Sequence, residues 1–131
     1  MASGPVLIAA AAKDPFATEL VQILQSEGRE VVVSRDAESA LRTTRVRQPA
    51  LVVLDTVLPR GDGLTLCRQL KADPATADIP VFCFSVLMSR DQCLEAGADG
   101  FMLKPVEQEL LLERIREVLD SRVTRLRRHF K

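Results

Sequence analysis

Hydrophobic and polar residues divide the chain into short apolar runs and longer stretches with helical spacing. Apolar runs of this length, without a regular polar alternation, are typical of strands buried on both faces of a sheet. They are Val6–Ala10, Glu30–Ser34, Leu51–Leu54, Val81–Ser85 and Asp99–Leu103. The pattern therefore predicts five strands.

A helix is predicted after each of these strands. Capping residues mark most of the starts, because Asp and Pro are favoured at the first positions of a helix. The starts are Asp14-Pro15, Asp36, either Asp62 or Gly63, and a position near Glu107. Gly28 and Gly97 are typical of helix ends. The fourth helix, which ends before Gly97, is expected to be short.

Five strands that each precede a helix predict an α/β protein with a doubly wound parallel sheet and helices on both faces. The apolar spacing predicts a core of Val6, Ile8, Leu20, Leu24, Val32, Leu51, Val53, Val81, Cys83, Phe84 and Leu103. Ligands of such sheets bind beyond the carboxyl ends of the strands. The candidate functional residues are therefore those just after the strands: Ala10 to Lys13, Asp55, Ser85 and Lys104.

Composition narrows the class of protein. The 131 residues are enough for one domain, and 18 basic residues balance 18 acidic ones. Such a chain has no overall field to hold it to DNA or to a membrane. No apolar run approaches the length of a membrane span, and Met1–Pro5 lacks a signal-peptide pattern. We therefore expect a cytoplasmic protein.

The cysteines and the single histidine offer no metal or catalytic pattern. Cys67, Cys83 and Cys93 are odd in number and are not spaced as zinc ligands. His129 lies in a basic tail, so we set aside a histidine-based catalytic pair. Buried thiols are the expected role of the three cysteines.

Several phosphate-binding chemistries are also excluded. The turn after the first strand is Ala9–Ala12, which lacks the glycines of a dinucleotide site, and no Walker-type lysine motif is present. A dehalogenase-like phosphatase needs a second Asp two positions after Asp55, where this chain has Val57. One carboxylate, one hydroxyl and one ammonium remain at the strand ends. That set suits an Asp that accepts a phosphoryl group, a Lys that pairs with it and a Ser that contacts the new oxygens.

Three ordered segments surround these residues. They are Leu51–Asp55 with Pro59–Gly63, Ile79–Ser85, and Glu95–Pro105. Through them the chain resembles a receiver domain of the bacterial response-regulator family, the CheY-like superfamily. In that family the segments hold the phosphoacceptor, the hydroxyl switch residue, and the aromatic switch position with its Lys-Pro turn. The resemblance covers about residues 5 to 120.

The resemblance implies a flavodoxin-like sheet of strand order 2-1-3-4-5 and a signalling module that is not an enzyme. A histidine kinase would phosphorylate Asp55, after which Ser85 and Phe101 shift and Lys104 pairs with the phosphoryl group. The Lys104-Pro105 peptide is typically cis in such domains. The implied partner is a signalling protein, either a histidine kinase or an output protein, and we expect neither a membrane nor a nucleic acid.

The chain departs from the family where receivers carry two adjacent acids after the first strand. The matching positions are Ala10 and Ala11, or Ala11 and Ala12 if the register slips by one. Mg²⁺ prefers oxygen ligands, so Asp55 and the Val57 backbone would hold it weakly at most. We therefore expect no cofactor, and phosphorylation that is much slower or absent.

Other charged residues near the strand ends are candidates to replace the missing acids or the metal ion that such acids would bind. Asp14 and Asp62 are interpreted as helix caps rather than metal ligands, and Lys13 as a solvated loop residue. Lys13 could instead reach Asp55 and stand where a metal would.

A second departure is one of length. The spacing from Ser85 to Gly97 is about three residues short of the family pattern, roughly one helical turn. A shorter or displaced fourth helix is expected.

The end of the chain has its own character. Residues 1–121 are predicted as the receiver domain, and 122–131 as a basic helical extension or tail. Five basic residues lie in that tail, and without them thirteen basic residues face eighteen acidic ones in the body. Val123, Leu126 and Phe130 continue the helical spacing. They would serve a partner or a dimer through the last helix, whereas a frayed, solvated end is the alternative.

Three functions remain open from the sequence. The favoured one is a degenerate receiver, or pseudo-receiver, that keeps Asp55 paired with Lys104 and acts mainly through protein contacts. The first alternative is a working phosphoacceptor with an unusual metal shell around Asp55. The second is a small-molecule-binding regulatory module with a pocket lined by Ala10 and Ala11.

Overall fold

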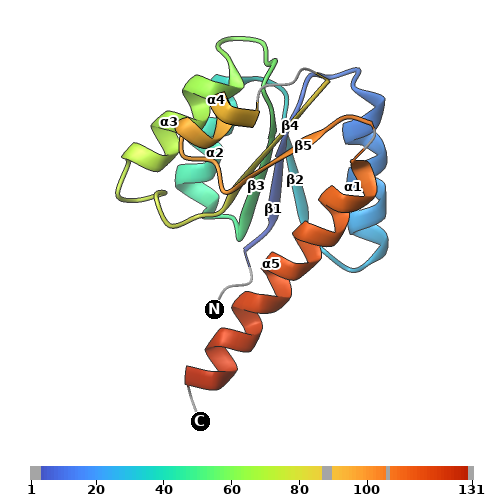
Figure 1. The fold of residues 1–131 in the computed structure, drawn as a ribbon, viewed down its shortest axis with the longest axis vertical. Helices are drawn as coiled ribbons and strands as arrows, with labels where there is room; N and C mark the ends of the chain where they lie inside the picture. The colour runs from blue at the N-terminus through green and yellow to red at the C-terminus, as the bar shows by residue number, and fades with distance from the viewer. Residues whose placement is uncertain (1–3, 87–89, 106, 130–131) are drawn as a thin grey trace.

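The computed structural model describes residues 4–86, 90–105 and 107–129, with side chains described as far as residue 120. Five strands alternate with five helices in this part of the chain (Figure 1). The strands are β1 Val6–Ala9, β2 Val31–Ser34, β3 Leu51–Asp55, β4 Val81–Ser85 and β5 Gly100–Leu103. The helices are α1 Pro15–Ser26, α2 Ala37–Arg47, α3 Gly63–Ala72, α4 Arg90–Glu95 and α5 Gln108–His129.

All neighbouring strands are parallel, in the order β2-β1-β3-β4-β5. This order confirms the doubly wound, flavodoxin-like sheet that the sequence predicts. Helices α1 and α5 cover one face, and α2, α3 and α4 cover the other (Figure 1). The carboxyl ends of the strands consequently meet along one edge of the sheet.

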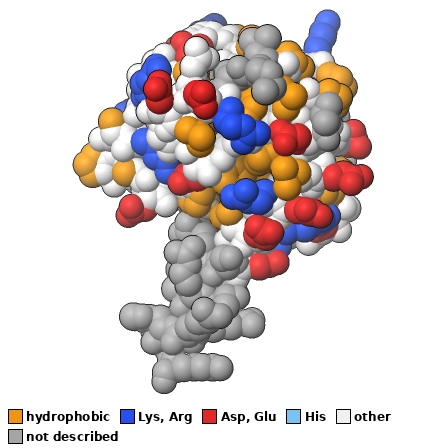
Figure 2. All heavy atoms as spheres, in the orientation of Figure 1, with side chains coloured by type: hydrophobic (Ala, Val, Ile, Leu, Met, Phe, Trp, Pro, Cys, Tyr) orange, Lys and Arg blue, Asp and Glu red, His pale blue; other side chains and the backbone are white. Residues whose placement is uncertain are grey.

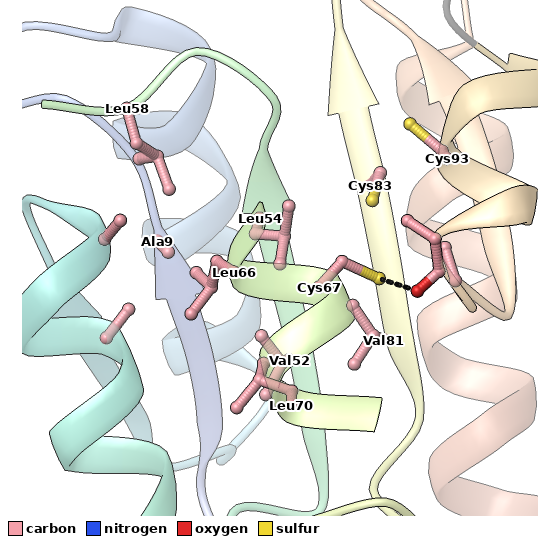
Figure 3. Packing of buried hydrophobic residues seen from close by; sticks show 14 of the residues in the cluster. Ala9, Val52, Leu54, Leu58, Leu66, Cys67, Leu70, Val81, Cys83 and Cys93 are labelled. Atoms are coloured by element: carbon pink, nitrogen blue, oxygen red, sulfur yellow. Dashed lines mark hydrogen bonds between the residues drawn. The ribbon is translucent and has the colours of Figure 1, made fainter. Parts of the chain in front are cut away.

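Two apolar cores lie on the two faces of the sheet. Successive strand residues point to opposite faces, so Leu7 and Ala9 join the core under α2 and α3, whereas Val6 and Ile8 join the core under α1 and α5. Figure 3 shows part of the first core, including Leu54 of β3 and Leu66 of α3. This two-sided burial explains why the strands are continuous apolar runs.

The predicted core is largely confirmed. Nine of its eleven residues are buried, and Val32 and Leu103 are only partly buried. These two lie on β2 and β5, the edge strands of the sheet. An edge strand has a neighbour on one side alone, so its side chains are less covered than those of central strands.

The predicted helix caps are also confirmed. Asp14, Asp36 and Asp62 each accept hydrogen bonds from backbone N–H groups of the first turn of α1, α2 and α3. Asp62, rather than Gly63, is therefore the cap of α3. Helix α4 has six residues, the shortest of the described helices, in keeping with the expected short element.

Helix α5 continues to His129 and extends away from the rest of the fold (Figure 1). The side chains of Val123, Leu126, Phe130 and the basic tail residues lie outside the described residues, so the proposed division at residue 121 stays a prediction. None of the helices in the described part of the chain is long and apolar enough to span a membrane.

Candidate functional site

The strand register brings the predicted site residues to one edge of the sheet. Ala9 pairs with Leu54, and Asp55 pairs with Phe84. The residues that directly follow neighbouring strands therefore lie side by side along this edge of the sheet. Ser85 pairs in turn with Leu103, immediately before Lys104. The site is assembled from residues far apart in sequence because parallel strands all end on the same side.

Asp55 is a nearly buried carboxylate, and contacts hold both of its oxygens. Its Oδ1 accepts a hydrogen bond from the backbone N–H of Val57 at 2.9 Å. Its Oδ2 lies 2.7 Å from the Nζ of Lys104. The side chain is 12% exposed. The expected pairing of Asp55 with Lys104 is thus present.

Lys104 occupies a more crowded position than the sequence suggested. Besides Asp55, its Nζ lies 2.5 Å from the Oδ2 of Asp14. The ammonium also lies 4.7 Å from the ring centre of Phe84 and 5.5 Å from that of Phe16, within the range of cation–π attraction. Only 8% of the side chain is exposed. The peptide bond to Pro105 is cis, as the resemblance implies.

Asp14 is the site residue whose part sequence reasoning missed. Its role as the cap of α1 is confirmed, with Oδ1 accepting from Phe16 and Ala17 at 2.9 and 3.3 Å. The other oxygen, Oδ2, contacts Lys104, which lies 90 positions away. Burial raises the pKa of Asp14, but Lys104 and the two capping N–H groups outweigh burial and hold that pKa below its ordinary value.

Lys13 does not stand beside Asp55 in place of a metal ion. Its side chain is exposed in the turn before α1, and the ammonium that contacts Asp55 belongs to Lys104. Lys13 and Asp14 are adjacent in sequence, yet only Asp14 enters the site in the described structure. The interpretation of Lys13 as a solvated loop lysine fits its exposure.

The hydroxyl of Ser85 lies beside a second hydroxyl that the sequence analysis did not single out. Thr56 Oγ1 donates to Ser85 Oγ at 2.8 Å, and both residues are buried. The carbonyl of Thr56 accepts from Gly63 N at 3.0 Å, which joins the end of β3 to the start of α3. Proximity of Thr56 to Asp55 in the chain was the available signal.

Phe101 packs on the opposite face of the sheet from Phe16 and Phe84, the two rings that Lys104 lies over. It is 2% exposed and belongs to the core under α2, α3 and α4, whereas Phe84 belongs to the opposite core. The guanidinium of Arg90, at the start of α4, lies 5.4 Å from its ring centre. Its predicted role as a switch residue stays a prediction.

The residues at the edge do not fit a bound Mg²⁺ ion. Ala10 follows β1, is fully buried and belongs to the same apolar core as Ile8 and Phe16, so it offers no oxygen ligand where the resemblance calls for an acid. One oxygen of Asp55 and one of Asp14 are already held by Lys104. Mg²⁺ requires several oxygen ligands in near-octahedral geometry, and this set centres on an ammonium instead. Among the described residues, no three or more His, Cys, Asp or Glu side chains gather as metal ligands.

The three cysteines lie away from this edge. All three are fully buried in the core under α2, α3 and α4, and Cys67 Sγ contacts the carbonyl oxygen of Ala96 at 3.5 Å (Figure 3). The expectation of buried thiols is confirmed. On the outside, acidic and basic side chains are interspersed on the face shown in Figure 2. This mixture agrees with the balanced charge of the sequence.

Comparisons with known proteins show which family this chain resembles in sequence. A family model described as the response regulator receiver domain matches residues 10–116. The DNA-binding dual master transcriptional regulator RpaA of Synechocystis is 36% identical over 110 residues, which cover 81% of this chain and 46% of RpaA. The response regulator PleD of Caulobacter vibrioides is 38% identical over 98 residues, covering 72% of this chain and 22% of PleD.

Solved structures agree with the family match. A putative response regulator from Chloroflexus aurantiacus superposes with a TM-score of 0.79 at 28% identity, over 89% of this chain and 98% of that one. The chain spans less than half of the length of RpaA and of PleD, whereas the match covers nearly all of the Chloroflexus chain.

Proposed function

The chain belongs to the response regulator receiver domains, and we propose that it is a degenerate member of them. On this proposal the protein keeps the fold and Asp55, but it acts in two-component signalling mainly through contacts with other proteins. Mg²⁺-dependent phosphorylation of Asp55 is slow or absent. The domain has no catalytic turnover of its own.

One observation carries the proposal: Lys104 pairs with Asp55, and within the described residues no group of three or more carboxylate, His or Cys side chains surrounds it as metal ligands. Ala10 and Ala11 supply methyl groups after β1, and the remaining nearby carboxylate, Asp14, is engaged by Lys104 and by the cap of α1. In phosphoryl transfer a divalent ion neutralises charge between donor and acceptor. Without a bound divalent ion, less positive charge would offset the repulsion between the negative phosphodonor and the Asp55 carboxylate.

A second candidate function keeps phosphorylation. Asp55, Ser85 and Lys104 meet at one edge of the sheet, which is the arrangement that a phosphoacceptor needs. A histidine kinase could therefore phosphorylate Asp55 through an unusual metal shell. The small-molecule alternative has less support, because Ala10 is fully buried among Ile8 and Phe16 rather than lining a pocket.

Incubation with a small-molecule phosphodonor and a Mg²⁺ titration separates the first two functions. We expect little or no acyl-phosphate on the unaltered protein by intact mass, and clear labelling of the double variant A10D/A11D, which restores both acids. The variant A10N/A11N controls for the change of volume, and D55N identifies the labelled residue. Circular dichroism of each variant checks that it is folded.

Two results would count against the degenerate receiver. Robust labelling of the unaltered protein at millimolar Mg²⁺ would favour the working phosphoacceptor. Equal, absent labelling of the unaltered protein and of a folded A10D/A11D would mean that the two alanines are not the cause.

The proposed partner contact involves the family's output surface, formed by α4, β5 and α5. Among the side chains described on its helices, the large apolar ones that are exposed include Leu94 on α4 and Leu110 on α5. Charged replacements of these leucines are expected to weaken partner binding while the fold persists. The partner class stays a histidine kinase or an output protein, and a dimer through α5 stays a prediction.

A further inference from the structure

We propose that Asp14 is the second anchor of Lys104, and that an Asp14–Lys104–Asp55 ion triad supplies from within the protein the positive charge that a divalent cation supplies in a metal-dependent site. Asp14 is then a positioning residue, since it acts on Asp55 through Lys104. The inference deepens the proposed function, on which it rests for the statement that no metal is needed.

The three side chains come from separate elements. Asp14 precedes α1, Asp55 ends β3 and Lys104 follows β5. The Lys104 ammonium has three N–H donors, and it lies 2.5 Å from one carboxylate and 2.7 Å from the other. The three side chains are only 8 to 12% exposed. Ion pairs shielded to this degree are screened far less than surface pairs.

Two aromatic rings also lie near the Lys104 ammonium. Phe16 and Phe84 pack with their ring centres 5.3 Å apart, and Lys104 lies within cation–π distance of both. Aromatic faces attract a cation without adding a competing carboxylate. The triad therefore combines two negative charges, one positive charge and an apolar floor.

The cap of α1 explains why Asp14 is held in position. Its Oδ1 is fixed by the N–H groups of Phe16 and Ala17, and Pro15 restricts the backbone at the first helical residue. Its Oδ2 is consequently directed at Lys104 before any ligand arrives. A cap that is already rigid costs little further entropy when it makes an ion pair.

The chain contains a matched aspartate without this pairing. Asp62 caps α3 with Oδ1 on Thr65 N at 2.7 Å, and its Oδ2 accepts from the Thr65 hydroxyl at 2.9 Å. Asp62 is exposed, and both of these hydrogen-bond donors belong to Thr65 of its own helix. The same replacement at Asp62 therefore removes a charge from a cap but leaves Lys104 untouched.

The test compares D14N with D62N, because Asn caps a helix about as well as Asp. In ¹⁵N-lysine-labelled protein without Mg²⁺ or phosphodonor, we expect the Lys104 ammonium signal to be protected from exchange in the unaltered protein and in D62N. We expect that signal to shift or disappear in D14N. The unfolding equilibrium constant should rise on the order of tenfold in D14N and remain near the original value in D62N.

The unaltered protein provides a second measurement that does not depend on a variant folding. Lys13 is exposed and serves as the internal reference. If the Lys104 ammonium exchanges as fast as that of Lys13, the triad is overturned. It is also overturned if folded D14N and D62N leave the Lys104 signal and the unfolding constant equally unchanged, since Asp14 is then a cap and nothing more.

Failure of this inference is distinguishable from failure of the proposed function. Phosphate labelling of the unaltered protein together with a protected, D14N-sensitive Lys104 would refute the degenerate receiver and leave the triad intact. No labelling together with a freely exchanging Lys104 would do the reverse.

Discussion

Helices α1 and α3 begin in the same way and yet take part in different kinds of structure. Both are capped by an aspartate, Asp14 or Asp62, whose Oδ1 accepts backbone N–H bonds of the first turn. At α3 the second oxygen stays within the helix, on the hydroxyl of Thr65. At α1 the second oxygen reaches Lys104, which follows the last strand.

A local capping signal therefore does not describe the whole role of a charged residue. A cap depends on three or four neighbouring residues, so it is encoded locally. The second oxygen of the carboxylate is free to be used by whatever the fold brings near. At Asp14 that is the ammonium of the candidate site, and at Asp62 it is the helix itself.

We expect the greatest loss of stability from removing the Lys104 ammonium, which contacts both Asp14 and Asp55. Lys104→Met leaves Asp14 and Asp55 close together without a counter-charge, so we expect a loss of about 3 kcal/mol in the free energy of unfolding. Urea denaturation followed by circular dichroism measures this loss. Lys13→Met is the matched control, and its effect should lie within about 0.5 kcal/mol because Lys13 is exposed. Equal stability of the two variants would mean that water compensates the carboxylates.

A smaller effect is expected at the start of α3, from Gly63→Ala. A Cβ at this position would lie 2.2 Å from the carbonyl oxygen of Asp55 and 2.6 Å from the Cα of Thr56. Both neighbours are backbone atoms, so α3 must move away from the end of β3. We expect a loss of about 1 to 3 kcal/mol by urea denaturation.

The result for Gly63→Ala also bears on the site. The helix start is joined to Thr56 by the hydrogen bond from Gly63 N, and Thr56 contacts Ser85. Displacement of α3 should therefore change the backbone amide shifts of Asp55 and Thr56 in NMR spectra. An unchanged stability with unchanged shifts would contradict the close packing of α3 against β3.

The smallest effect concerns the pH dependence of the Asp62 cap. The Thr65 N–H chiefly lowers the pKa of the Asp62 carboxyl, against a smaller opposing effect of burial. A carboxyl with a lower pKa in the folded state stabilises the fold above its unfolded pKa, and this contribution is lost as pH falls through the folded value. The urea midpoint of the unaltered protein should therefore fall towards that of D62N, or below it, between about pH 4 and pH 2.

Above about pH 5 the difference between the midpoints of the unaltered protein and D62N should be constant. A difference that keeps changing there would point to another titrating group. A difference that stays constant down to pH 2 would show that the Asp62 carboxyl has the same pKa in the folded and unfolded protein, so that its ionisation does not stabilise the fold.

Sequence reasoning predicted the fold well because its signals are local or periodic. The apolar runs gave five strands within a residue or so of their ends, and aspartate caps placed three helix starts. The strand ends also placed Asp55, Ser85 and Lys104 at one edge, since parallel strands share the direction of their carboxyl ends. The incomplete burial of Val32 and Leu103 was not predicted, because edge position depends on the strand order.

Local sequence signals were enough to predict which chemical groups stand at the ends of the strands, including Ala10 and Ala11 after β1. This follows from the two-residue repeat of strands and the capping preferences of helices, which act over a few residues. The packing of the folded chain was needed to show that Asp14 rather than Lys13 contacts Lys104 in the site and that Thr56 donates a hydrogen bond to Ser85. Such contacts join side chains up to 90 positions apart, and their distances depend on how whole helices pack against the sheet.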